Sequence, residues 1–319
     1  FINGFYETWP IIYPENAYGL ATTGQTIVNV TDSKNIKLYV DDEPFWLPHA
    51  NVRSFDRRLN MKSGTLDRDI VWETPSGKRV SIKSRRLVSF EHRHVAAMFY
   101  QITLLNAAAP VVLSSEMIAN DPAPRRANYD PRQAKVFSEK VLNHRLSYAK
   151  GQRIVLCHAT NKSGILLACA IDHTLDTSLP ATWKTDYTPD AGHVVASIDA
   201  EPGQPITLMK FIVYHTSHTA SPEEVCARAE RTLERAVSAG FPALLAGQER
   251  YMEDFWQRSD VKVMTNPDGA MASTTAVQQA LRFNLFHILQ ACARAENTGV
   301  PAKGLTGGAY EGHYIWVSR

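Results

Sequence analysis

The sequence predicts a mainly β N-terminal domain, built as an antiparallel sandwich, followed by an α-helical region. Up to about Ser217, short apolar runs with a period of two recur at near-regular spacing, with almost no helical pattern between them. At Ser221 the apolar period changes to that of amphipathic helices. These two observations place a large sheet structure first and helices after it.

The strands can be placed by their alternation and by the turns between them. Asp41-Asp42 and Pro75 to Lys78 are turn sequences, the second of which closes a hairpin. The candidate strands are Thr26–Val30, Ile36–Val40, Ile70–Trp72, Val80–Ile82, Val95–Leu105, Val111–Met117, Val141–Tyr148, Arg153–His158, Ile165–Ile171, His193–Ile198 and Ile206–His215. Alternate residues of each strand are expected to face a shared core.

The helical region has clear start and stop signals. Ser221 is a candidate N-cap, Pro222 suits the first helical position, and Glu224 can complete a capping box. Gly240 ends this first helix and Pro242 restarts a second one. A third helix is predicted from about Thr275 to Ala295, with an apolar face made of Val277, Leu281, Leu285, Ile288, Leu289 and Cys292.

Composition excludes some classes of function. The 319 residues carry 34 basic and 32 acidic side chains, a net charge of +2, which gives no electrostatic reason to expect nucleic acid or an anionic membrane as partner. Hydrophobic content of 44% and charged content of 21% are those of an ordinary globular protein. No apolar run approaches the ~20 residues of a membrane span.

The four cysteines, Cys157, Cys169, Cys226 and Cys292, are far apart and have no metal-ligand spacing. All lie in apolar strand-like or helical runs, so we expect reduced core residues, which favours the cytoplasm. No signal peptide is present at the start of this sequence, although Phe1 is not an initiator methionine.

The stretch Pro301-Ala302-Lys303-Gly304-Leu305-Thr306-Gly307-Gly308-Ala309-Tyr310-Glu311-Gly312-His313-Tyr314-Ile315-Trp316 is the candidate functional segment. Its four glycines permit tight turns, and its aromatic and histidine side chains can stack or hydrogen-bond. Such a loop suits the wall of a pocket for a polar ring. A pocket wall this close to the end of the sequence predicts that the rest of the pocket lies elsewhere.

This stretch resembles the loop that opens the catalytic barrel of glycoside hydrolase family 65. The family pattern is Pro-Ala-Lys-Gly-Leu-Thr-Gly-Glu-Gly-Tyr-x-Gly-His-x-Phe-Trp-Asp-Thr-Glu, and the chain follows it to Trp316. It departs at Gly308-Ala309 and at Val317-Ser318-Arg319, which stands in place of Asp-Thr-Glu. The segments 4–11, 72–77 and 278–286 resemble the family in the same order, so the similarity covers about the first two-fifths of a typical member.

The resemblance implies a fold and its divisions. Residues 1–218 would form the family's N-terminal super-sandwich, residues 219–272 its helical linker, and residues 273–319 the incomplete start of an (α/α)6 catalytic barrel. The barrel would hold one of its twelve helices, whose apolar face we expect to be uncovered. Poor solubility or self-association would follow.

The resemblance also implies which residues could touch substrate. The family's general acid, a glutamate, and its phosphate-binding residues lie beyond Trp316, so no catalytic residue is expected in this chain. Trp316 is predicted to contact the glucosyl ring, the alternative being packing in the barrel wall. Tyr310 and His313 would face the pocket or else hold the loop by backbone hydrogen bonds. Lys303 is expected to pair with a carboxylate.

Three functions remain open at this point. The first is an N-terminal portion of an inverting phosphorylase that converts an α-glucosyl disaccharide and phosphate into β-glucose 1-phosphate and a sugar. The second is a trehalose-type hydrolase portion, and the third a non-catalytic sugar-binding or interaction sandwich. The resemblance implies no metal or organic cofactor, and inorganic phosphate would be a co-substrate.

The family is often dimeric, and the sequence does not determine which glycosidic linkage is cleaved. Because Val317 replaces an aspartate that accepts hydrogen bonds from sugar, and the acid is absent, the chain alone is predicted to be inactive.

Three other groups of residues are weaker candidates for a functional site. His92-Arg93-His94 and His215-Thr216-Ser217-His218 have spacings that a metal could use, but no further ligands accompany them, so histidines bonded to backbone are favoured over a metal. Glu7 with the acidic turn at 41–43 is a poor candidate for a catalytic carboxylate pair. The tryptophans could form a sugar-stacking platform, with core packing as the favoured alternative: Trp9, Trp46, Trp72 and Trp183.

Overall fold

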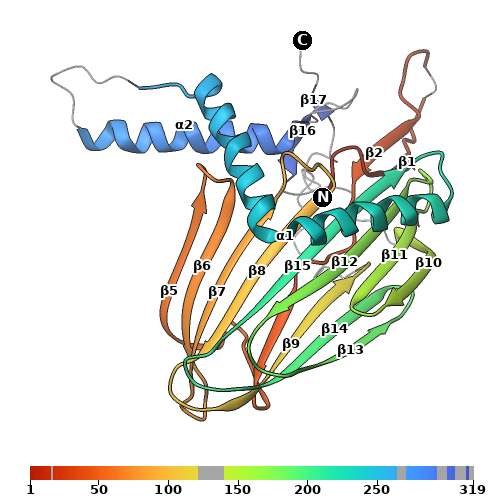
Figure 1. Cartoon of the computed structure of the whole chain (residues 1–319). Helices are drawn as coiled ribbons and strands as arrows, with labels where there is room; N and C mark the ends of the chain where they lie inside the picture. The colour runs from red at the N-terminus through yellow and green to blue at the C-terminus, as the bar shows by residue number, and fades with distance from the viewer. Residues whose placement is uncertain (16, 121–139, 264–270, 293–299, 306–313, 316–319) are drawn as a thin grey trace.

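The computed structural model describes residues 1–15, 17–120, 140–263, 271–292, 300–305 and 314–315 (Figure 1). The strands are β1 Tyr6–Pro10, β2 Thr23–Ile27, β3 Ile36–Val40, β4 Glu43–Pro44, β5 Asn51–Asn60, β6 Thr65–Glu73, β7 Arg79–Val88, β8 Val95–Leu104, β9 Ala109–Ile118, β10 Leu142–Lys150, β11 Arg153–Thr160, β12 Leu166–Asp176, β13 Ala181–Tyr187, β14 Ala191–Ala200, β15 Pro205–Ser217, β16 Val300–Leu305 and β17 Tyr314–Ile315. The helices are α1 Pro222–Ser259 and α2 Met271–Ala291.

Two antiparallel sheets form the sandwich that the sequence predicts. The larger has eight strands in the order β10-β11-β12-β15-β8-β7-β6-β5, and the smaller has five in the order β13-β14-β9-β3-β4. Inward-facing side chains of both sheets share the core between them, for example Trp72 and Ile82 from the larger sheet and Leu38, Leu113 and Ile198 from the smaller. Burial of these alternate positions is what stabilises each strand.

The first half of α1 covers the outer face of the larger sheet (Figure 1). Val225, Ala229 and Leu233, one turn apart on the helix, pack against strand residues such as Cys157 and Phe211. The central strands β11 and β12 are therefore buried on both faces, and their apolar runs are almost continuous rather than alternating. The sheet is consequently sandwiched between a second sheet and a helix.

The helix signals in the sequence are confirmed. The Ser221 hydroxyl accepts a hydrogen bond from the backbone N–H of Glu224 at 3.2 Å, and Pro222 begins the helix. Gly240 interrupts α1 with φ 76° and ψ 164°, a conformation almost restricted to glycine, so the second half of α1 leaves the sheet in a new direction (Figure 1). Pro242 follows this break, as predicted for a restart.

The predicted strand list is incomplete. It omits the short strands β1, β4, β16 and β17, the last two of which lie in the segment predicted as a loop. It also omits β5, most of whose residues are exposed, and β13, and both are edge strands of their sheets. An edge strand with a polar outer face shows less of the apolar alternation on which the prediction rests. In the described part of the chain, no helix has the length and apolar character needed to span a bilayer.

Candidate functional site

The described part of the candidate segment is the hairpin β16–β17. The two strands are antiparallel, with Val300 opposite Ile315 and Pro301 opposite Tyr314. The hairpin therefore brings together the two ends of the segment that the sequence singled out. The predicted sugar-contact residues Tyr310, His313 and Trp316, and the side chain of Lys303, lie outside the described residues. Their roles stay predictions.

The hairpin lies against the C-terminal end of α2. Gly304 has φ 60°, and a Cβ atom added there would be 3.4 Å from the Cβ of Ala291. The Asn3 amide nitrogen donates to the carbonyl oxygen of Ala291 at 2.9 Å. The start of the chain, the end of α2 and β16 thus meet at Ala291. This meeting point fixes the base of the candidate loop.

An aromatic cluster anchors α2 to the rest of the molecule. Phe286 of α2 is buried and packs edge-on to Phe90, with ring centroids 6.3 Å apart, while Tyr251 of α1 stacks on Phe90 at 5.3 Å. Trp256 donates its indole N–H to the carbonyl oxygen of Met61 at 2.8 Å. The cluster therefore joins both helices to the loops that follow β5 and β7, and it sets the position of the hairpin.

Two polar contacts support this anchor. Arg282 of α2 binds both carboxylate oxygens of Asp260 at 2.6 and 2.9 Å, and these bonds hold the pKa of the Asp260 carboxyl below its usual value. The Gln278 amide bonds the backbone of Val261 and Val263. The Arg282 side chain is 41% exposed, so solvent screens the ion pair and its main effect is orientation of α2.

The buried face predicted for α2 is partly wrong. Phe286 and Ala291 are buried, but Val277 and Ile288 are 51% and 56% exposed. The prediction assigned one continuous apolar stripe to the core, whereas the described residues cover the helix mainly around Phe286. Leu289 of the predicted stripe packs against this cluster, whereas Val277 and Ile288 are the stripe residues left exposed by the described part of the chain.

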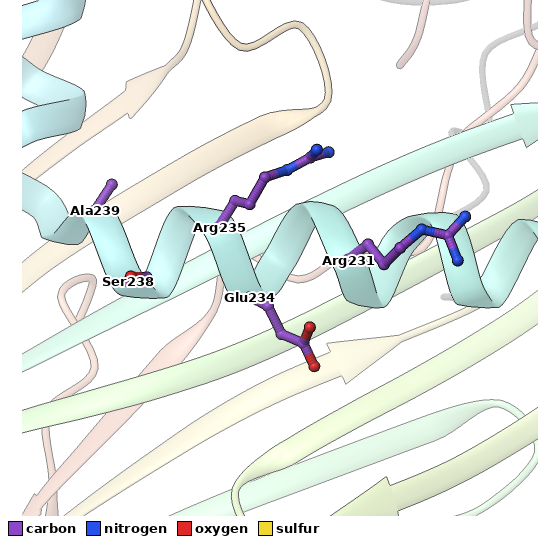
Figure 2. Close-up of a pocket in the computed structure, with 5 residues that line it drawn as sticks. All are labelled: Arg231, Glu234, Arg235, Ser238 and Ala239. Carbon is purple, nitrogen blue, oxygen red and sulfur yellow. The ribbon is translucent and has the colours of Figure 1, made fainter.

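One depression lies on the surface of α1. Its volume is about 580 Å³, and it is lined by Arg231, Glu234, Arg235, Ser238 and Ala239. Figure 2 shows Arg231 and Arg235 extending to the same side of the helix, while Glu234 points the other way, toward the strands. Glu234 binds Arg153 of β11 at 2.9 Å. Because every lining residue belongs to one helix, no groups from different elements converge on a ligand.

A second cavity, of about 380 Å³, lies between the outer face of the larger sheet and the break in α1. Phe99, Phe241, Pro242 and Leu245 form its apolar part, and charged residues of β6 and β7 its polar part. Arg85 binds the Asp67 carboxylate at 2.7 Å, and the Gln101 amide donates to Thr207. Arg85 and Asp67 thus satisfy each other, and neither cavity includes a predicted site residue.

The histidine motifs have structural partners. The rings of His94 and His215 stack with centroids 3.9 Å apart, His94 Nδ1 bonds the carbonyl oxygen of Tyr214, and His215 Nε2 bonds the Thr232 hydroxyl. Burial, with the neighbouring His94 and α1 arginines, lowers the pKa of His215 to about 4. The prediction of a backbone-bonded histidine is confirmed for His94. In the described ranges, no three histidine, cysteine or acidic side chains gather into a metal-type group.

The remaining candidates divide between core and surface. Glu7 is 2% exposed and accepts hydrogen bonds from the backbone of Thr8, Lys162 and Ser163, so it is a structural carboxylate. Trp72 lies in the core, while Trp46 is 63% exposed. Cys157, Cys169 and Cys226 are buried free thiols, as predicted, and Cys292 is half-buried.

Comparison with known proteins assigns this architecture. Residues 1–255 match the model of the glycosyl hydrolase family 65 N-terminal domain, and residues 282–318 match that of the family 65 central catalytic domain. The α,α-trehalose phosphorylase of Thermoanaerobacter brockii is 37% identical over 318 residues, covering 100% of this chain and 40% of the relative. The kojibiose phosphorylase of Escherichia coli strain K12 is 28% identical, covering 96% of this chain and 38% of the relative.

A solved structure supports the same fold. A human-microbiome protein assigned provisionally as a kojibiose phosphorylase superposes with a TM-score of 0.82 at 20% identity, covering 98% of this chain and 39% of that one. The chain spans about 40% of the length of the curated relatives it matches. With a family model matched over residues 1–255 and a relative 37% identical along the whole chain, this chain belongs to glycosyl hydrolase family 65.

Proposed function

We propose that this chain is the N-terminal portion of an inverting disaccharide phosphorylase. The proposed reaction converts an α-glucosyl disaccharide and inorganic phosphate into β-glucose 1-phosphate and a free sugar. The observation that carries the proposal is the 37% identity to a trehalose phosphorylase along the whole chain. The kojibiose phosphorylase similarity supports the same reaction class with a different linkage.

In this reaction the proposed role of the chain is to position one wall of the sugar site rather than to supply the catalytic acid. Cleavage of a glycosidic bond needs a carboxylic acid that protonates the leaving oxygen, and in phosphorolysis phosphate takes the place of the water that a second carboxylate would activate. No metal or organic cofactor enters the proposal. The sandwich, α1 and α2 position the β16–β17 hairpin, and Trp316, Tyr310 and His313 supply one wall of the sugar site. A cytoplasmic homodimer is the proposed form, and the buried free thiols support the location.

The test of this function is the phosphate dependence of disaccharide cleavage by the protein that contains this chain. On a panel of trehalose, kojibiose and maltose, we expect glucose 1-phosphate to form only with phosphate present. Glucose release at the same rate without phosphate would instead identify a hydrolase. The isolated 319-residue chain is expected to show no turnover with any of the three, and measurable turnover would contradict the supporting role assigned to it.

The role of Trp316 has its own test. In the protein that contains this chain, Trp316→Ala is expected to lower kcat/KM for the disaccharide by about 10-fold to 100-fold, because the indole would no longer cover the sugar ring. Trp46→Ala is the matched control, since Trp46 is an exposed tryptophan of the sandwich. Equal kinetics for Trp316→Ala and Trp46→Ala would place Trp316 in packing rather than in sugar binding.

A further inference from the structure

The two faces of β5, β6 and β7, the orange strands of Figure 1, differ in the charges that they carry. On the outer face basic and acidic side chains are mixed. Arg85 of β7 binds Asp67 of β6 at 2.7 Å, Arg58 binds Asp56 along β5 at 2.6 Å, and Lys83 is opposite Asp69 in the register. The inner face carries the alternate residues of the same strands. There the charges are Arg57, Arg68 and Arg86, and all are positive.

These three arginines lie close together by register. Arg57 is directly opposite Arg68 on the neighbouring strand, and Arg86 is two residues beyond Ser84, the partner of Arg68 on the other side. Like charges directly opposite one another destabilise a sheet. Burial and the charges of Arg68 and Arg57 lower the pKa of the Arg86 guanidinium. Within the described residues, no carboxylate forms an ion pair with any of the three.

Two polar atoms at the centre of this group have no hydrogen-bond partner among the residues that the structure describes. Ser84 is 7% exposed and its hydroxyl is buried without a hydrogen bond, and the same is true of Nε of Arg68. The two residues are cross-strand partners, so both unpartnered atoms lie at one point of the inner face. Buried polar groups are normally hydrogen-bonded, so these two atoms are open to a water or a ligand that both can reach.

The group lies where the sandwich opens. On β6 and β7 the inter-sheet core ends at Ile70 and Ile82, and Arg68 and Ser84 are the next inward positions. Further along the same face Leu59 and Val88 are 37% and 67% exposed. A small ligand can therefore reach the arginines from solvent while the Ser84 hydroxyl stays buried beneath them.

We propose that Arg57, Arg68, Arg86 and Ser84 bind a tetrahedral oxyanion, either inorganic phosphate or the phosphoryl group of a sugar phosphate. Guanidinium groups donate paired N–H bonds to phosphate oxygens, and a hydroxyl donor completes the set. A doubly charged anion matches three guanidinium groups better than one carboxylate does. The proposal stands on the side chains of the sandwich and does not depend on the reaction proposed above.

The test is binding of inorganic phosphate to the full chain, measured by titration calorimetry at constant ionic strength set with chloride. Saturable binding is expected, weakened at least 10-fold in Arg68→Gln and in Arg86→Gln. Arg58→Gln is the matched control, because it removes the same charge from the outer face of β5, and its Kd is expected within 2-fold of the parent. Absence of saturable binding, or equal weakening by Arg58→Gln, would overturn the proposal.

A second pair of measurements separates binding from a structural role. Without phosphate, Arg68→Gln and Ser84→Ala are expected to have a Tm equal to or above that of the parent, since each removes an uncompensated polar group. With phosphate, the Tm of the parent should rise and that of the variants should not. A lower Tm for both variants without phosphate, with an unchanged response to it, would show that the residues are structural. Repeating the titration with glucose 1-phosphate distinguishes the two candidate ligands. A lower Kd for glucose 1-phosphate than for inorganic phosphate would identify a sugar-phosphate site, and the reverse would identify a phosphate site.

Discussion

Replacing Gln248 with leucine is expected to lower the free energy of unfolding by about 3–5 kcal/mol. The Gln248 side chain is fully buried at the junction of α1 with the larger sheet. Its amide nitrogen donates to the carbonyl oxygens of Gly64 at 3.3 Å and Val88 at 3.2 Å, and its oxygen accepts from the N–H of Phe90 at 2.8 Å. Leucine would leave three backbone groups without partners, and each costs about 1–3 kcal/mol.

Urea unfolding followed by circular dichroism measures this loss. Glu249→Leu is the matched control: it places the same side chain one position along at an exposed site, where a change within about 0.5 kcal/mol is expected. Gln248→Glu sharpens the test, because it keeps an acceptor for Phe90 but loses both donors. Stability of Gln248→Leu within 1 kcal/mol of the parent would contradict a stabilising role for the three Gln248 hydrogen bonds.

The sequence contains the signal for Gln248, although the prediction did not use it. Leu244, Gln248 and Met252 are spaced by four residues and all three are buried, so a glutamine occupies the apolar stripe of the helix. A polar residue on such a stripe must find partners in the core. Which partners it finds depends on Gly64 and Phe90, more than 150 residues away, and periodicity cannot supply that information.

Local features of this fold could be predicted, and long-range ones could not. The Ser221 cap and the break at Gly240 depend on neighbouring residues and are confirmed. The position of β15 between β12 and β8, and the pairing of Arg57 with Arg68, depend on register between distant segments. No short sequence motif therefore indicates that Arg57, Arg68 and Arg86 lie together. The sugar-contact residues were named through family resemblance rather than chemistry, and they stay predictions.

Acid is expected to destabilise the fold through His173 before most carboxylates titrate. His173 is 7% exposed, its Nε2 bonds the Ser115 hydroxyl at 2.7 Å, and its Nδ1 bonds the carbonyl oxygen of Gln152 at 3.2 Å. Burial, and then the charge of Lys210, lower its pKa from 6.5 to about 3. His173 joins the two sheets, so its neutral form is part of the sandwich core.

The sign follows from proton uptake. Below pH 6.5 the unfolded chain protonates His173 while the folded chain does not, so the unfolded state gains stability as the pH falls. Above pH 6.5 His173 is neutral in both states and does not lower the free energy of unfolding. Between pH 6.5 and pH 3 the free energy of unfolding falls progressively because only the unfolded state takes up the proton. Each pH unit inside that window lowers the free energy of unfolding by about 1.4 kcal/mol. His215, with a pKa of about 4, acts in the same direction.

Urea unfolding of the parent and of His173→Gln between pH 7 and pH 4.5 isolates this effect. His173→Gln is expected to be less stable at pH 7, because the amide fills the site less well, yet to lose about 2–3 kcal/mol less than the parent over the range. The readout is the difference between the slopes of the two proteins. The carboxylates and Lys210 are present in both proteins, so their contributions cancel in that difference. His49→Gln, at an exposed position, should keep the slope of the parent. Equal slopes for the parent and His173→Gln would mean that His173 is protonated in the folded sandwich, and the neutral bridge between Ser115 and Gln152 would be wrong.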